Sequence, residues 1–134
     1  MIINELNGKV IDTKEVCIHD DILYELRFYR LEKRIKLIIE KELDETKKYI
    51  IEFIKVIGFE MTSCDFWGRS PHILEFEYVE VNDRIIIPKL FIKEKLYPGC
   101  SSLTKEKNYI ETLITFTSGD QLRIACEEIV IEDM

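Results

Sequence analysis

The stretch from Cys64 to His72 contains the widest mix of chemically active side chains in the sequence. It reads Cys64-Asp65-Phe66-Trp67-Gly68-Arg69-Ser70-Pro71-His72. A thiol and an imidazole on one loop could act as nucleophile and general base, with Asp65 or a distant carboxylate orienting the imidazole. No helix N-terminus is predicted next to Cys64 that would lower the pKa of its thiol. A hydrolase that uses Cys64 and His72 is therefore kept only as an alternative, and the chain is expected to be non-enzymatic.

The same nine residues, which we call the tryptophan loop, also suit recognition of another protein. Trp and Arg are the residue types most enriched at interface hot spots. The candidate interface residues in this loop are Asp65, Trp67, Arg69 and His72. A structural role competes with this interpretation and is preferred for Trp67, because a single Trp in a small β domain usually belongs to its core. In that case Asp65 and Arg69 form a local ion pair.

A second group of possible ligands lies at Cys17, His19 and Asp21, which would share one face of a strand. Zinc needs three or four ligands, and the remaining candidates show no CxxC or HxxxH spacing. We therefore expect no bound metal, and interpret Asp20-Asp21 as a turn that starts a strand at Ile22. The sequence also lacks the glycine-rich phosphate-binding signatures, so no cofactor is expected.

The charge of the chain limits its partners. The net charge is −7, whereas nucleic acids and anionic membranes are bound by clustered Lys and Arg. Five basic residues do gather around one predicted hairpin tip, but Glu25, Glu32 and Glu40 flank them, so cross-strand ion pairs are the better account. The basic residues are Arg27, Arg30, Lys33, Arg34 and Lys36. A basic protein is the partner class that the charge favours.

The length of the chain indicates how many domains it forms, and its cysteines indicate the compartment in which it acts. Its 134 residues fit one domain, 1–134, and neither a linker nor an internal repeat interrupts it. The first residues lack the basic and apolar regions of a signal peptide, and no apolar run is long enough to span a bilayer. We expect a cytoplasmic protein in which Cys17, Cys64, Cys100 and Cys126 are reduced thiols.

A two-residue alternation of apolar and charged side chains recurs from Ile22 onward and predicts an all-β fold. Clear examples are Ile22–Phe28, Arg34–Leu37 and Gln121–Ile124. The expected architecture is an antiparallel β-sandwich or barrel of about eight to ten strands with at most a short helix. The predicted strands cover about 23–30, 34–41, 48–57, 59–63, 73–81, 109–117, 121–126 and 129–131, with a short strand possible at 9–12.

Three positions are harder to interpret. Residues 31–57 also contain helical spacing, but their many Ile and Val residues favour strands. A glycine within a strand pattern, here Gly58, indicates a bulge or bend. Pro88 makes Ile85–Lys93 either an edge strand or a short helix that begins at the proline, with one or two turns at most.

The order of these elements resembles that of small acidic all-β bacterial proteins, including immunity proteins of polymorphic toxin systems. The resemblance is carried by His19-Asp20-Asp21 before a strand, by the tryptophan loop, and by the hairpin Phe116–Ile124. It implies a single-domain protein that acts by binding another protein, encoded next to a toxin gene. The resemblance assigns no functional residue.

The preferred function is thus a protein-binding domain, an immunity-type inhibitor of a basic partner. Glu75 and Glu77 are expected on the outer face of one strand, opposite Leu74, Phe76 and Tyr78, where they could meet such a partner. Further carboxylates crowd the C-terminal end, at Glu127, Glu128, Glu132 and Asp133. A merely solubilising face is the competing interpretation.

A small-ligand-binding β-barrel is the remaining alternative. In it, Tyr24, Phe28 and Phe53 would line a cavity instead of filling it.

Overall fold

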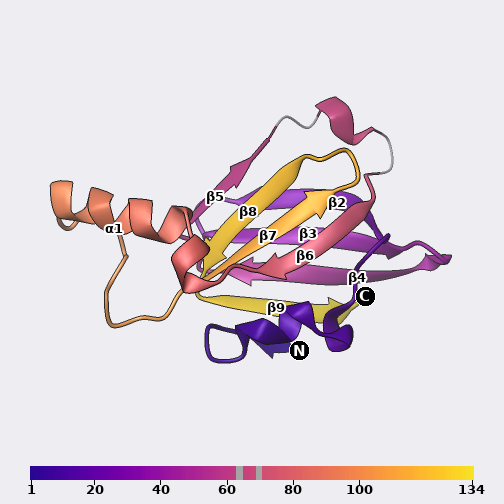
Figure 1. The fold of residues 1–134 in the computed structure, drawn as a ribbon, viewed down its shortest axis with the longest axis horizontal. Coiled ribbons are helices and arrows are strands. Elements are labelled where there is room, and N and C mark those ends of the chain that lie inside the picture. The colour runs from indigo at the N-terminus through magenta and orange to yellow at the C-terminus, as the bar shows by residue number, and fades with distance from the viewer. Residues whose placement is uncertain (63–64, 69–70) are drawn as a thin grey trace.

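In a computed structural model of the chain, which describes residues 1–62, 65–68 and 71–134, two antiparallel sheets face each other (Figure 1). The first sheet has the order β1-β9-β4-β3-β2 and the second the order β5-β8-β7-β6. The strands are β1 (Ile2–Ile3), β2 (Ile22–Tyr29), β3 (Arg34–Lys41), β4 (Asp44–Ile54), β5 (Gly58–Met61), β6 (Ile73–Tyr78), β7 (Ile110–Phe116), β8 (Gln121–Cys126) and β9 (Glu128–Asp133). The predicted antiparallel sandwich is confirmed, and the sheets do not close into a barrel.

The core lies between the sheets and follows from the alternation in the sequence. Most of the fully buried side chains of β3, β4, β7 and β8 alternate along their strand, because successive side chains of a strand point to opposite faces. The rings of Phe53 and Phe76 meet across the core with their centroids 6.5 Å apart. The fully buried core side chains include Ile35, Leu37, Ile39, Ile51, Phe53, Ile114, Phe116, Leu122 and Ile124.

Residues 31–57 form strands, as their β-branched content predicted, but two details differ. β4 begins at Asp44, before the predicted start at 48, after a register shift in its pairing with β3. Gly58 is not a bend within one strand: the chain leaves the first sheet after Ile54 and enters the second at Gly58. A Cβ at Gly58 would lie 2.8 Å from Ile86 Cγ2, so glycine permits close packing of the following helix.

Of the two alternatives for Ile85–Lys93, the helix is correct and the edge strand is not: α1 (Ile86–Leu96) extends from one end of the sheets (Figure 1). Its 11 residues make about three turns, more than expected. The helix begins two residues before Pro88, and proline is tolerated in a first turn because the N–H it lacks would have no partner within the helix. Glu111 supplies the acceptors for this turn, as described below.

The N-terminal segment also differs from the prediction. In place of the short strand considered at 9–12, the structure has a 3₁₀ helix, Gly8–Asp12, followed by a second at Lys14–Val16. A Cβ at Gly8 would lie 2.6 Å from the Tyr78 ring, so this segment can lie tightly against β6. Shorter 3₁₀ helices occur at Asp65–Trp67 and Val81–Asp83. Within the described part of the chain, no helix has the length and apolar character needed to cross a membrane.

Candidate functional site

A hollow of about 450 Å³, which we call the edge groove, separates residues 11–19 from the free edge of β6. β6 is the last strand of its sheet and pairs only with β7. The groove is lined by Ile11, Asp12, Thr13, Lys14, Val16, Cys17, Ile18, His19 and by Leu74–Tyr78. It therefore brings together two parts of the sequence that contain candidate residues, the first around Cys17 and the second around Glu75.

A β-bulge changes the predicted face of Leu74. Ile73 pairs with Phe116 and Glu75 with Thr115, so Leu74 is an extra residue in β6. Its side chain is 44% exposed and does not share the buried face of Phe76 and Tyr78, contrary to the prediction. From Glu75 onward the alternation is regular.

Glu75 and Glu77 occupy the outer side of β6, as predicted, and their carboxylates lie close together. Burial raises the pKa of Glu77, and the hydrogen bond and negative charge of Glu75 raise it further. Asp12 adds a third negative charge, while Arg123 partly offsets the effect. The groove therefore concentrates negative charge at the free edge of the sheet.

The opposite end of the groove is formed by the turn before β2. His19 Nδ1 lies 2.9 Å from Asp20 Oδ2, and Asp20 adopts a left-handed conformation with φ of 68°. His72 Nδ1 lies 3.1 Å from the backbone oxygen of Asp20. The two histidines of the chain thus flank one turn.

The three residues considered as metal ligands do not converge. Asp21 is buried and accepts hydrogen bonds from the Tyr49 hydroxyl at 2.8 Å and from Lys41 Nζ at 3.1 Å, whereas Cys17 and His19 are exposed. Burial, together with the bond to Asp21, raises the pKa of Tyr49 far above its ordinary value. Among the described residues, no group of three or more His, Cys, Asp or Glu side chains could hold a metal ion.

The tryptophan loop is only partly described, since Cys64, Arg69 and Ser70 lie outside the described residues. The predicted Cys64–His72 and Asp65–Arg69 pairs therefore stay predictions. Trp67 packs against the core, with its ring centroid 4.4 Å from that of Phe116, in agreement with the structural role. Its Nε1 is enclosed without a hydrogen-bond partner in the described part of the chain, and the neighbouring Phe66 is 77% exposed.

The aromatic residues proposed to line a barrel cavity are not gathered around one space. Phe53 is buried in the core, whereas Tyr24 is 58% and Phe28 47% exposed. The basic hairpin residues make surface ion pairs: Arg27 Nε lies 2.7 Å from Glu25, and Arg34 lies 2.7 Å from Glu52 on the neighbouring strand.

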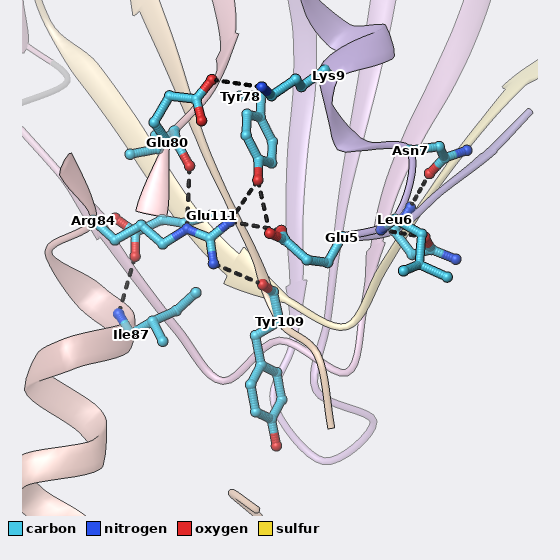
Figure 2. A network of polar contacts seen from close by, with 12 residues as sticks. Glu5, Leu6, Asn7, Lys9, Tyr78, Glu80, Arg84, Ile87, Tyr109 and Glu111 are labelled. Atoms are coloured by element: carbon cyan, nitrogen blue, oxygen red, sulfur yellow. Dashed lines mark hydrogen bonds and ion pairs between the residues drawn. The ribbon is translucent and has the colours of Figure 1, made fainter. Parts of the chain in front are cut away.

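A polar network that the sequence did not predict secures one end of the groove (Figure 2). Arg84 is nearly buried and donates to Glu5 Oε2 at 2.6 Å, to the Tyr78 hydroxyl at 3.0 Å and to the backbone oxygens of Val79 and Tyr109, both at 3.2 Å. The Tyr78 hydroxyl in turn donates to Glu5 Oε1 at 2.8 Å. These contacts fix the end of β6 against the N-terminal segment.

Glu111 is a second buried polar group that the sequence did not reveal. Its carboxylate is fully buried and accepts the N–H groups of Ile85 at 2.9 Å and Ile87 at 3.0 Å, and Arg123 Nη1 at 2.8 Å. Burial alone would disfavour its charge, but these donors outweigh that effect and hold the pKa of Glu111 below its usual value. Because Arg123 forms an ion pair with Glu111, it offsets the negative charge near Glu77 only in part.

Comparison with known proteins informs the fold and not the site. No known family profile matches the sequence, and no curated protein matches it either. The crystal structure of an uncharacterized protein from Neisseria gonorrhoeae is similar, with a TM-score of 0.51 and 15% sequence identity over 100% of this chain and 99% of the other. The similarity therefore extends to the arrangement of strands along both chains.

Proposed function

We propose that the chain is a non-enzymatic protein-binding domain that recognises a basic partner through the edge groove, as an inhibitor of immunity type. The observation that carries the proposal is the close approach of Glu75 to Glu77, where burial raises the pKa of Glu77 and the hydrogen bond and negative charge of Glu75 raise it further. Two like charges held together cost folding free energy. A basic side chain of a partner would relieve that repulsion on binding.

The neighbouring charges support this interpretation. Asp12 is exposed at the rim of the groove, and Arg123, which partly offsets the raised pKa of Glu77, is 2.8 Å from Glu111. The whole chain carries a net charge of −7. A negative field of this kind speeds the approach of a positively charged protein, as when an inhibitor mimics the phosphates that a nuclease toxin binds.

The compartment follows from the same proposal. An immunity-type inhibitor would act in the cytoplasm, where thiols stay reduced, and Cys17 and Cys100 are exposed free thiols.

The test is the association rate with the basic protein encoded beside the gene, purified in an inactive form. We expect association to be far slower at ~0.5 M than at ~0.05 M salt, because the screening length shortens by several ångströms. The double variant Glu75→Lys/Glu77→Lys should slow association about tenfold or more without unfolding the domain. The control, Glu32→Lys/Glu106→Lys, makes the same change in net charge at two exposed positions outside the groove.

Two outcomes contradict the proposal. If the association rate is indifferent to salt and to both double variants, the groove is not the contact, and the tryptophan loop, with Trp67 and His72, becomes the better candidate. If both double variants slow association equally, net charge alone matters and the groove has no special role.

A further inference from the structure

We infer that the edge groove binds its partner by strand addition, in which a short basic segment pairs with the backbone of Phe76. This inference rests on the proposed function and specifies how the partner is held. Strand addition uses main-chain hydrogen bonds for affinity and alternate side chains for specificity.

The direction of each backbone group in β6 follows from one hydrogen bond. Val79 N donates to Glu111 O at 2.9 Å, so the backbone N–H and C=O groups of Val79 point toward β7. In an antiparallel pair of strands, every second residue exchanges backbone hydrogen bonds with its partner. The backbone N–H and C=O groups of Glu77 and Glu75 therefore also point toward β7. Phe76 and Tyr78 must then direct their N–H and C=O groups to the free edge. Tyr78 confirms the alternation, because its N–H donates to Asp12 Oδ1 at 3.2 Å, outside the sheet.

Phe76 is left without such a partner. At one end of β6, Ile73 exchanges hydrogen bonds with the turn before β2: its N–H donates to Asp21 O at 2.8 Å, and its C=O accepts from Asp20 N at 2.7 Å. At the other end Tyr78 is bonded to Asp12. Between them, no hydrogen bond to the N–H or C=O of Phe76 is found among residues 1–62, 65–68 and 71–134. Backbone groups at a sheet edge that borders a hollow form a template for another strand.

The length of the opening limits the occupant. Ile73 and Tyr78 are five residue steps apart, which is about 16 Å of strand at ~3.3 Å per residue. Both ends are closed by the contacts with Asp20, Asp21 and Asp12. The opening therefore suits about four extended residues, such as the tip of a loop or a chain end, and not a long strand.

The side chains around the opening define the sequence that fits. Glu75 and Glu77 are two residues apart on the outer side of β6, so they favour basic residues two apart in the added segment. The residue between these two would pair with Phe76 and point inward, beside Ile11, Val16 and Ile18. All three of these side chains are buried and apolar. The expected pattern is basic, apolar, basic.

The test uses two synthetic peptides, acetyl-Arg-Val-Arg-Val-amide and the same peptide with an N-methyl group on the first valine. Binding is followed by the amide resonance of Phe76 and by its hydrogen exchange, at low salt. The unmodified peptide should shift this resonance and slow its exchange, because Phe76 N–H gains an acceptor. The methylated peptide, which carries the same charge, should bind about tenfold more weakly, because it cannot donate to Phe76 C=O.

The variants separate this inference from the proposed function. Glu75→Lys/Glu77→Lys should abolish binding of both peptides, and Glu32→Lys/Glu106→Lys should leave it unchanged. If both peptides bind equally through the two glutamates and exchange at Phe76 does not slow, strand addition is wrong and the acidic contact stands. If neither peptide shows salt-dependent binding at millimolar concentration, both proposals fail.

Discussion

Arg84 and Glu5 are separated by 79 positions in the sequence, yet the guanidinium and the carboxylate are 2.6 Å apart. Arg84 lies between β6 and α1, whereas Glu5 precedes the 3₁₀ helix that borders the edge groove. Their contact therefore connects the two walls of the groove with the base of the helix (Figure 2).

Replacing Arg84 by Ala should lower the free energy of unfolding by about 3–5 kcal/mol, because it removes the cation paired with Glu5 and the donor to the Tyr78 hydroxyl in a nearly buried site. Urea denaturation measures the change, and a double-mutant cycle with Glu5→Gln should give a coupling energy above about 1 kcal/mol. Lys89→Ala is the control. Lys89 pairs with Glu60 at 3.5 Å on the exposed surface, so its loss should cost about 0–1 kcal/mol. Equal costs for the two substitutions would contradict a special role of Arg84.

Replacing Glu111 by Gln should destabilise the protein by about 2 kcal/mol or more at pH 7, because a neutral amide cannot satisfy Arg123 and the N–H groups of α1 together. The pKa of Glu111 is lowered in the folded state, so its charge stabilises the fold above its unfolded pKa, near ~4.3. That contribution to stability is lost as the pH falls through the pKa of Glu111 in the folded state. The difference between wild type and variant should therefore shrink in acid, which thermal melts from pH 7 to pH 3 can follow. A difference that is constant with pH would mean that the charge of Glu111 contributes nothing.

Replacing Glu77 by Gln should change the stability in the opposite direction. The folded-state pKa of Glu77 is raised, so its ionisation opposes folding at pH values above that pKa, and the penalty disappears as the pH falls below it. The variant should be more stable than wild type at pH 7, by less than about 1 kcal/mol because the side chain is only half-buried, and equally stable near pH ~3.5. Chemical denaturation at the two pH values provides the comparison. A loss of stability at pH 7 would show that Glu75 and Glu77 do not repel each other.

Replacing Gly8 by Ala tests the close approach of the N-terminal segment to β6. The new Cβ would lie 2.6 Å from two ring carbons of Tyr78, and the ring cannot move easily because its hydroxyl is bonded to Glu5 and Arg84. We expect a cost of about 1–3 kcal/mol. Lys9→Ala, next in the chain and exposed, should stay within about 0.5 kcal/mol of wild type. Full stability of the Gly8 variant would mean that this segment does not hold its place against Tyr78.

The local sequence predicted correctly those strands in which the surrounding structure favours the same conformation as the local residue preferences. The bounds of Arg34–Lys41 and Gln121–Cys126 agree with the structure, because alternating β-branched side chains and polar turns act in the same direction there. Ile85-Ile86-Ile87 has the same local preference, yet it begins a helix. The buried Glu111 carboxylate, 24 positions from Ile87, accepts the N–H groups of the first turn and overrides that preference.

The candidate site was predictable only on one side. The positions of Glu75 and Glu77 on the outer face follow from the two-residue period of β6. The opposite wall could not be anticipated, because it depends on glycine at position 8 packing against Tyr78 and on the distant pair of Glu5 and Arg84. The bulge at Leu74 is equally hidden, since an extra residue in one strand is defined only by its pairing with β7.

The place of β9 in the first sheet has a consequence for folding. β9 is the last strand in the chain, but it lies between β1 and β4. During synthesis β4 emerges long before β9 does, and until then one edge of this Ile-rich strand has no partner. Pairing between such distant segments is slow, so the domain should fold in milliseconds to seconds and only after most of the chain is present. Because β4 waits for β9, the order of the strands in this sheet exposes nascent chains to aggregation through the unpaired edge of β4.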